Sequence, residues 1–355
     1  MIARQFNKIF NNKYGYRMKH QFIVRETGEV ADEQFYHDRL VNYLYSIMRE
    51  EGSLVYRLVT SKRLSSLMAW INYDFPAGKW LTGGSGFLES SGIDTSEFYD
   101  PLDSLNTARK FFERKIRYME CRPMPLNADS VVAPADSRII TGSFASESLL
   151  FLKEKFFSLD DLLDAKRGWS SLYRNGDYAI FRLTPDKYHY SHVPVSGIVL
   201  DFYEIDGAYN SCNPGAVLAV NKAYSRNRRV VTIIDTDVRG GTGCGKVAMI
   251  EVAALMIGDI VQCYSEWMYE TPAPLIHGMF LNKGQPKSLF RPGSSVDILI
   301  FENGRVKFDR DLIENSLKTG IETRYMKSFT RPVVETEIKV RSSIGKSLRQ
   351  EEIND

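Results

Sequence analysis

Short apolar runs in the middle and at the end of this 355-residue chain constrain its fold more than any other feature. They are rich in Val, Ile, Phe and Tyr, and Gly, Pro, Asn or Asp residues bound them, as is typical of β-strands between turns. The runs are residues 139–142, 178–183, 197–202, 229–234, 247–261 and 296–301. No regular alternation with long helices separates them, so they predict an antiparallel β core.

The first part of the chain has a different pattern. Leu40, Tyr43, Leu44, Ile47 and Met48 recur at helical spacing, and apolar residues mixed with Arg and Lys continue to residue 70. This segment could lie on a membrane surface as an interfacial helix pair. Alternatively, it could pack on the protein's own core or on a second subunit of a homodimer. Residues 80–87 form a glycine-rich, partly apolar loop that could enter a bilayer or cover the site.

Together these patterns predict an α+β protein. We expect a helical N-terminal region over residues 1–125, with helices for packing or for membrane-surface contact. An antiparallel β-rich catalytic domain should follow over residues 126–330. Residues 331–355 are polar and predict a loose C-terminal tail.

Composition narrows the function. Hydrophobic residues make up 43% and charged residues 25% of the chain, as in folded soluble proteins. The net charge of +2 favours neither nucleic-acid binding nor strong attraction to anionic membranes. The four cysteines show no metal-binding spacing and fit reduced thiols in a cytoplasmic protein. No signal peptide is visible, and the run 247–261 is shorter than the roughly 20 residues of a spanning helix. An enzyme acting on lipid would therefore work peripherally, on the membrane surface.

Residues 240–246, Gly-Gly-Thr-Gly-Cys-Gly-Lys, follow a predicted strand and match part of a phosphate-binding loop. The Ser or Thr that would hold magnesium is replaced by Val247, and the next residues favour a strand over a helix. We therefore predict a glycine-rich hairpin here and no nucleotide site.

The last apolar run follows a Gly-Ser-Ser sequence, residues 293–295. Such sequences are common at ordinary turns. This one could also break its own chain, because Gly293 has no side chain to shield its carbonyl and the Ser294 hydroxyl can attack it, turning the amide into an ester. Elimination and hydrolysis would leave a pyruvoyl group at the new N-terminus. This covalent cofactor condenses with amines and acts as an electron sink.

A serine nucleophile needs a base, and a histidine base needs a carboxylate that fixes its tautomer. Asp136 lies in one polar segment, and His189 and His192 lie in another. With Ser294 they supply the three residue types. The two histidines are three residues apart, but no cysteine or carboxylate cluster completes a metal site around them. We expect His20, in the polar N-terminal part, to be solvated.

Six segments, in order along the chain, carry a family resemblance. They are Asn-Thr-Ala-Arg-Lys-Phe-Phe-Glu-Arg-Lys with Arg122-Pro123 behind it (106–123), Pro-Ala-Asp (134–136), Ser-Leu-Asp-Asp-Leu-Leu (158–163), Tyr-His-Tyr-Ser-His-Val-Pro (188–194), Asn-Arg-Arg-Val-Val (227–231) and Lys-Gly-Gln to Gly-Ser-Ser (283–295). In these segments the chain resembles the phosphatidylserine decarboxylase family, whose members are pyruvoyl enzymes. Several ordered motifs over about two hundred residues make a stronger signal than any single motif.

The resemblance implies that the chain cleaves itself between Gly293 and Ser294 into a β chain and an α chain that stay together. It implies that His192, with Asp136, is the base that activates Ser294. It also implies that His189 acts in the later decarboxylation, near the carbon that is reprotonated. The implied substrate is phosphatidylserine, which would be converted to phosphatidylethanolamine and CO2.

Departures from the family pattern keep alternatives open. Ser295 stands where the family has threonine and Ser137 where it has glycine. Serine keeps the hydroxyl, so the cleavage chemistry should survive. Relatives with Gly-Ser-Ser include soluble decarboxylases, so a pyruvoyl enzyme acting on a free amino acid is the alternative function. A protein that keeps the fold without activity would remain a single uncleaved chain.

Overall fold

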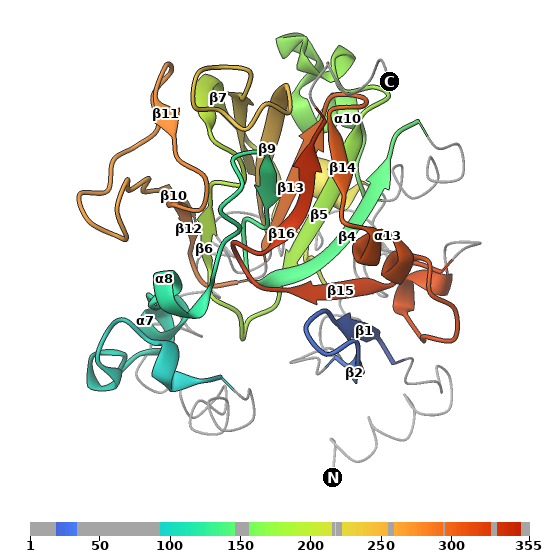
Figure 1. Ribbon diagram of the computed structural model, residues 1–355. Helices are drawn as coiled ribbons and strands as arrows, with labels where there is room; N and C mark the ends of the chain where they lie inside the picture. The colour runs from blue at the N-terminus through green and yellow to red at the C-terminus, as the bar shows by residue number, and fades with distance from the viewer. Residues whose placement is uncertain are drawn as a thin grey trace.

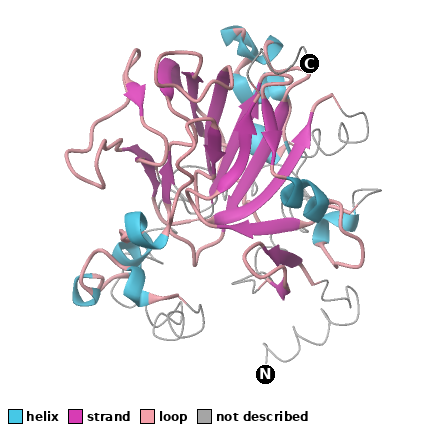
Figure 2. Cartoon of the chain, viewed as in Figure 1, coloured by secondary structure: helices cyan, strands magenta, loops and turns pink. Residues whose placement is uncertain are grey.

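A ten-stranded sheet organises the protein (Figures 1 and 2). The computed structural model describes residues 19–33, 93–145, 156–214, 217, 222–254, 259–293, 295–327 and 332–348. In spatial order the strands are β11 (Phe280–Leu281), β7 (Gly197–Ile205), β8 (Arg229–Asp235), β9 (Lys246–Ala253), β13 (Ser295–Phe301), β5 (Asp177–Leu183), β4 (Ser137–Ser143), β15 (Glu335–Ile338), β1 (Gln21–Val24) and β2 (Val30–Asp32). All neighbouring pairs are antiparallel except β1 with β15.

Two three-stranded sheets accompany the large one. The first contains β10 (Ile260–Gln262), β12 (Pro286–Phe290) and β6 (Tyr190–His192). The second contains β14 (Val306–Phe308), β16 (Ser343–Ser347) and β3 (Ser130–Val132). The first matters for function, because β6 carries one of the predicted histidines and β12 leads to the Gly-Ser-Ser sequence.

The described helices are short and lie around the strands (Figure 2). They are α7 (Ala108–Phe112), α8 (Tyr118–Cys121), α10 (Leu159–Leu163), α12 (Ala223–Arg226) and α13 (Arg310–Ser316), with 3-10 turns at Thr95–Glu97, Leu102–Ser104, Ala165–Arg167, Trp169–Ser171 and Arg324–Lys327. Helices this short are not stable alone and depend on tertiary packing. Among the described helices, none has the length and apolar character needed to cross a membrane.

The central strand β13 is buried on both faces. Val296, Ile298 and Ile300 pack into one apolar cluster, together with residues of α10 and α12. Leu299 and Phe301 pack into a second cluster on the other face, with residues of α13 and the β3–β14–β16 sheet. Because a strand covered on both faces reads as a continuous apolar run, the sequence signal at 296–301 was strong.

Every predicted β run in the central part of the chain contains strand in the structure. The runs at 139–142, 178–183, 197–202, 229–234 and 296–301 lie in β4, β5, β7, β8 and β13, and the run 247–261 contributes to β9 and β10. The glycine-rich segment joins the antiparallel strands β8 and β9, so the predicted hairpin is confirmed. A strand, not a phosphate-binding helix, follows it.

The helical prediction for residues 1–125 is wrong over residues 19–33. These residues form β1 and β2, which extend the main sheet beyond β15. The helices predicted between Leu40 and residue 70, and the loop at 80–87, lie outside the described residues. The described protein is therefore β-rich, with its N-terminal strands built into the same sheet as the catalytic motifs.

The prediction of a loose tail after residue 331 is also wrong over residues 335–347. Glu335–Ile338 and Ser343–Ser347 are the strands β15 and β16. The sequence predicted a tail because many side chains of this segment are polar. Some of those side chains are nevertheless buried. Glu335 and Thr336 are each only 1% exposed, and Glu335 binds Arg182 and His20 from distant parts of the chain.

Candidate active site

The predicted cleavage site directly precedes the central strand β13. Ser294 lies outside the described residues, but both its neighbours are described. Gly293 has a φ of 149°, in a region that residues with a β-carbon rarely adopt. Ser295, the first residue of β13, pairs with Leu183 of β5 and Ala253 of β9, and its buried hydroxyl has no hydrogen-bond partner among the described residues. The bond that we predict to be cleaved thus borders a strand paired on both sides and involves a glycine with unusual backbone geometry.

Asp136 lies at the same end of the sheet. It immediately precedes β4, where Arg138 pairs with Arg182 of β5. Two strand spacings of about 4.8 Å each separate β4 from β13, so Asp136 and the start of β13 are roughly 10 Å apart along the sheet. The strand register therefore brings two predicted positions, 158 residues apart along the chain, to the same end of the sheet.

The Asp136 carboxylate is buried and fully ionic. Arg122 donates to it from Nε at 2.9 Å and from Nη2 at 2.7 Å, and the amide of Val340 donates at 2.8 Å. Burial opposes ionisation, but the Arg122 guanidinium outweighs burial and holds the pKa of Asp136 below its usual value. Arg122 also binds both carboxylate oxygens of Glu97, each at 2.8 Å. This pair of carboxylates fixes Arg122 in place.

His192 is fully buried and its tautomer is fixed. Its Nδ1 lies 2.9 Å from the carbonyl oxygen of Gly284, which can only accept, so Nδ1 carries the proton. Its Nε2 lies 2.9 Å from the hydroxyl of Tyr188 and therefore accepts from it. Burial lowers the pKa of His192 to about 3, so the ring is a neutral imidazole whose Nε2 has a free lone pair for accepting a hydrogen bond or a proton.

Asp136 and His192 come close but do not hydrogen-bond to each other. The His192 amide donates to the carbonyl of Pro134 at 2.7 Å, two residues before Asp136. The Asp136 carboxylate acts on the imidazole through space and raises its pKa slightly, against the larger effect of burial. In this structure the carbonyl of Gly284, not a carboxylate, fixes the tautomer.

His189 occupies a different environment. Its ring stacks on Phe112 of α7, with centroids 3.6 Å apart, and it is fully buried. Burial, reinforced by the nearby charge of Arg114, lowers the pKa of His189 to about 3. The carbonyl of Lys187 acts weakly in the other direction, but neither ring nitrogen makes a hydrogen bond of ordinary geometry. A buried imidazole with two unpartnered nitrogens is unusual and is suited to binding a polar group of a substrate.

Four residues that contact the predicted site residues were not assigned a role from the sequence. Tyr188 and Gly284 bind the two ring nitrogens of His192, Arg122 holds Asp136, and Phe112 stacks on His189. Each of the four lies within a segment that carries the family resemblance. The motifs could therefore have nominated them, but only the three-dimensional contacts assign what each one holds.

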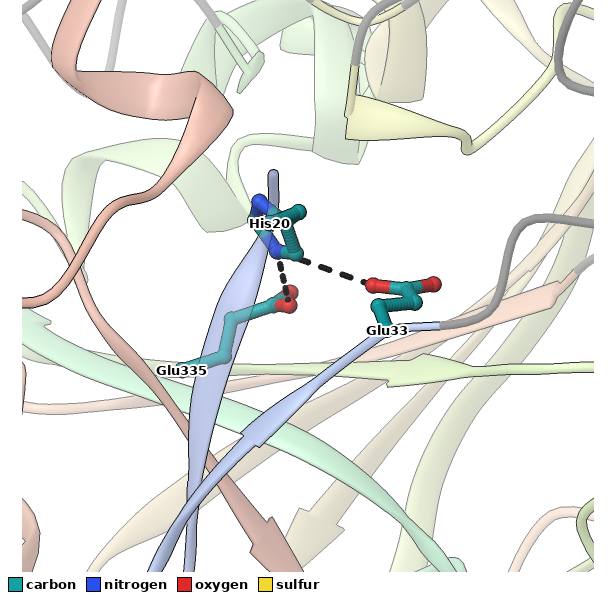
Figure 3. Close-up of side chains that lie close together, drawn as sticks. All are labelled: His20, Glu33 and Glu335. Carbon is teal, nitrogen blue, oxygen red and sulfur yellow. Dashed lines mark hydrogen bonds and ion pairs between the residues drawn. The ribbon is translucent and has the colours of Figure 1, made fainter. Parts of the chain in front are cut away.

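A second buried polar cluster lies farther along the sheet (Figure 3). His20, Glu33 and Glu335 bring their ligand atoms within 4.8 Å of one another. His20 Nε2 donates to Glu335 at 2.8 Å, since its Nδ1 accepts from the amide of Arg324. The prediction of a solvated His20 is therefore wrong: the ring is 1% exposed. The sequence could not show this, because Glu335 lies 315 residues away.

Arginines already neutralise the two carboxylates of this cluster. Arg182 binds Glu335 from Nε at 2.8 Å and Glu33 from Nη1 at 2.9 Å, and Arg138 binds Glu33 as well. Arg138 and Arg182 face each other on neighbouring strands, a like-charge pair that would be unfavourable without these carboxylates. We therefore interpret the cluster as an ion-pair network that ties the N-terminal strands to the core, and not as a metal centre.

A cavity of about 130 Å³ opens beside Asp136. Its charged lining residues are Arg25, Glu26, Arg122, Asp136, Lys187, Glu337 and Lys339. Each of the four cations already pairs with a carboxylate, so the cavity does not by itself select an anionic head group.

The sequence of the chain is similar to those of known proteins. The sequence profile of the family described as phosphatidylserine decarboxylase matches residues 108–324, which contain every predicted site residue. A phosphatidylserine decarboxylase proenzyme of Ruminiclostridium cellulolyticum is 31% identical over 307 residues, covering 86% of this chain and 95% of the relative. One of Chlamydia muridarum is 32% identical over 313 residues, covering 85% and 93%. A phosphatidylserine decarboxylase proenzyme 2 of Oryza sativa subsp. japonica is 37% identical over 242 residues, covering 66% and 35%. The chain belongs to the phosphatidylserine decarboxylase family.

Proposed function

We propose that this chain is a self-processing, pyruvoyl-dependent decarboxylase that converts phosphatidylserine to phosphatidylethanolamine and CO2. The observation that carries the proposal is the position of the Gly293–Ser294 bond. In this family member the bond directly precedes the central strand β13, at the end of the sheet where Asp136 also lies. The names of the similar proenzymes support both the substrate and a maturation step.

Maturation begins with proton removal from Ser294. His192 is the base, because its Nε2 carries the lone pair and Gly284 fixes its tautomer. Tyr188 now binds that nitrogen, so the proton passes either through the Tyr188 hydroxyl or after its displacement. The Ser294 oxygen bonds to the Gly293 carbonyl carbon and the C–N bond breaks, giving an ester. Elimination then releases the Gly293 carboxylate, and hydrolysis with loss of ammonia leaves the pyruvoyl group.

The products are a β chain ending at Gly293 and an α chain beginning at residue 294. They stay together because β13 of the α chain pairs over seven residues with β5 on one side and with β9 on the other. Strands β14, β15 and β16 of the α chain also pair with strands of the β chain or with one another.

In turnover, the pyruvoyl carbonyl would supply the electron sink for loss of CO2. The described residues fit such a group, since Gly293 permits the chain break and the adjacent Ser295 hydroxyl is buried without a partner. His189 is the residue we assign to the proton that replaces CO2. Its nitrogens have no protein partner, and its backbone carbonyl accepts from Phe290 at 3.0 Å, three residues before Gly293.

The decisive experiment is intact-mass analysis of the purified protein and of Ser294→Ala. Two chains, with the mass of the α chain matching an N-terminal pyruvoyl group, support the proposal. A Ser294→Ala protein that still splits after Gly293 would refute it, because alanine has no nucleophilic oxygen.

The second candidate is decarboxylation of a free amino acid by the same chemistry, favoured by Ser295 in place of threonine. We favour the lipid and a peripheral location on the membrane surface, with residues 40–70 and 80–87 as the segments for contact with lipid or with a second subunit. Flotation with phosphatidylserine liposomes and a substrate panel separate the two functions. No flotation, together with turnover of a free amino acid, would assign the soluble activity.

A further inference from the structure

A further group of buried polar side chains, separate from the His20 cluster, includes one residue of β13 itself. Asp297, at the centre of that strand, accepts a hydrogen bond from Ser191 of β6 at 2.6 Å. Glu251 of β9, directly opposite Asp297 in the strand register, binds Lys287 of β12 at 2.6 Å. All four side chains have no exposed surface. None of them belongs to the site residues that the sequence predicted.

The charges in this group do not balance unless one carboxyl group is protonated. Two carboxyl groups share a single ammonium group, and Lys287 is hydrogen-bonded to Glu251 and to Gln262. Glu251 is further satisfied by Ser288 and by the Gln262 amide at 3.0 Å. Among the described residues, Asp297 has a hydrogen bond only from Ser191, and its Oδ1 has no partner. Asp297 is therefore the carboxyl group that lacks a counter-charge.

The surroundings of Asp297 are otherwise apolar. On β5 the paired residue is Phe181, and on β9 it is Glu251, whose negative charge repels a second one. Burial raises the pKa of Asp297 well above its ordinary value and Glu251 raises it further, while Ser191 and Lys287 oppose this only in part. These contacts indicate a neutral carboxylic acid at neutral pH.

The position of this acid links it to the reaction. Ser191 lies on β6 between His189 and His192, and Asp297 lies three residues after Ser294. If the proposed cleavage occurs, Ser191 belongs to the β chain and Asp297 to the α chain. Their hydrogen bond then joins β6, which carries His192 and directly follows His189, to the strand that begins next to the pyruvoyl group.

We propose that Asp297 is a positioning residue for decarboxylation. As a neutral acid it binds Ser191 and thereby holds the histidine-bearing strand β6 against the start of the α chain. This inference rests on the proposed function, whereas the neutrality of Asp297 does not. The two parts therefore need separate experiments.

The first experiment uses the uncleaved Ser294→Ala protein, so it does not depend on processing. Thermal unfolding is compared between Ser294→Ala and Ser294→Ala/Asp297→Asn from pH 5 to pH 8.5. Asparagine keeps an acceptor for Ser191 and mimics a neutral acid. A group whose folded pKa is raised stabilises the protein at low pH and loses that contribution as the pH rises. The midpoint of the double variant should therefore rise relative to the single variant by several degrees as the pH increases. A difference that is constant with pH, with asparagine destabilising throughout, would show an ionised Asp297 and overturn the inference.

The second experiment measures kcat and KM on phosphatidylserine in detergent micelles. Asp297→Leu and Ser191→Ala should still mature but lose about tenfold or more in kcat with little change in KM, because β6 and the α chain lose their tie. Asp297→Asn should stay within about threefold of the wild type. Thr232→Val is the matched control. Like Ser191, Thr232 is a fully buried strand residue, but its hydroxyl has no hydrogen-bond partner among the described residues.

Two outcomes would contradict the positioning role. One is wild-type kcat in both Ser191→Ala and Asp297→Leu. The other is an Asp297→Asn loss as large as that of Asp297→Leu. If Asp297→Leu does not fold, Ser191→Ala decides alone, because it removes the same hydrogen bond at smaller cost. A wild type that never cleaves would refute the proposed function instead, and the pH experiment would still test Asp297.

Discussion

Replacing Arg182 by methionine should destabilise the protein strongly, although Arg182 touches none of the predicted catalytic residues. The residue is 4% exposed, and its guanidinium makes four contacts, to Glu335 at 2.8 and 2.5 Å and to Glu33 at 2.9 and 2.7 Å. Methionine keeps an unbranched apolar stem but removes the guanidinium, so the described partners left to the two buried carboxylates are Arg138, His20 and the Tyr325 hydroxyl. Removing one partner of a buried ion pair typically costs about 3–5 kcal/mol. At about 2–4 °C per kcal/mol, the unfolding midpoint should fall by roughly 6–20 °C.

The loss should depend on pH in a defined direction. Burial alone would raise the pKa of Glu33 and Glu335, but Arg182 outweighs it and both have a pKa below the ordinary 4.5. Groups with a depressed folded pKa contribute stability above their unfolded pKa and lose it as the pH falls. The gap between Arg182→Met and its parent should therefore be widest near pH 7 and should narrow as the pH falls through 4.5.

The assay is thermal unfolding in the Ser294→Ala background, so that cleaved and uncleaved chains do not mix. Arg310→Met is the control, because Arg310 binds Glu314 at 2.6 Å but its side chain is 90% exposed. Exposed pairs one helical turn apart contribute about 0.3–0.5 kcal/mol, so that midpoint should move by no more than about 2 °C. An Arg182→Met midpoint that falls no further than the Arg310→Met midpoint would refute the interpretation of this network as a tie for the N-terminal strands.

The remaining predictions concern maturation and turnover. His192→Ala and Asp136→Ala should block or greatly slow cleavage, because each acts on the proton transfer from Ser294; normal processing of His192→Ala on denaturing gels would exclude it as the base. His189→Ala should still give two chains but decarboxylate about 10²–10⁴-fold more slowly, and accumulation of its proenzyme would instead assign His189 to cleavage. Activity should survive dialysis without pyridoxal phosphate or metal and fall with hydroxylamine, since the carbonyl belongs to the chain. Restoration of activity by added pyridoxal phosphate would contradict a pyruvoyl enzyme.

The strands were predictable because their signal is local. A run such as 296–301 combines β-branched and aromatic residues between turn residues, and burial on both faces requires that composition. The C-terminal strands β15 and β16 lack this signal. Glu335 and Thr336 are buried strand residues although they are polar, and the charge of Glu335 is compensated by Arg182, which lies 153 residues away. A sequence read locally treats such residues as solvated.

The candidate site was predictable as a set of residues but not as a set of contacts. The order Asp, His, Ser and the surrounding motifs nominate Asp136, His192 and Ser294. They suggest that a carboxylate accepts a hydrogen bond from the His192 imidazole, whereas in the structure Nδ1 donates to the backbone carbonyl of Gly284. Backbone acceptors carry no sequence signature, since every residue has one. The same reasoning explains why Asp297 escaped notice, because its importance depends on the absence of a counter-charge around it.

If the chain cleaves itself as proposed, the architecture requires folding to come first. Strand β13 pairs with β5 on one side and β9 on the other, and the cleavage site directly precedes it. The base, its orienting carbonyl and its hydroxyl partner all come from residues 188–284, on the other side of the bond to be broken. An unfolded chain therefore has no assembled base near Ser294, and it cannot cut itself prematurely. If the proposed cleavage occurs, complete ladders on both sides of β13 keep the two products joined, and the chemistry at residue 294 changes without release of the strand that follows it.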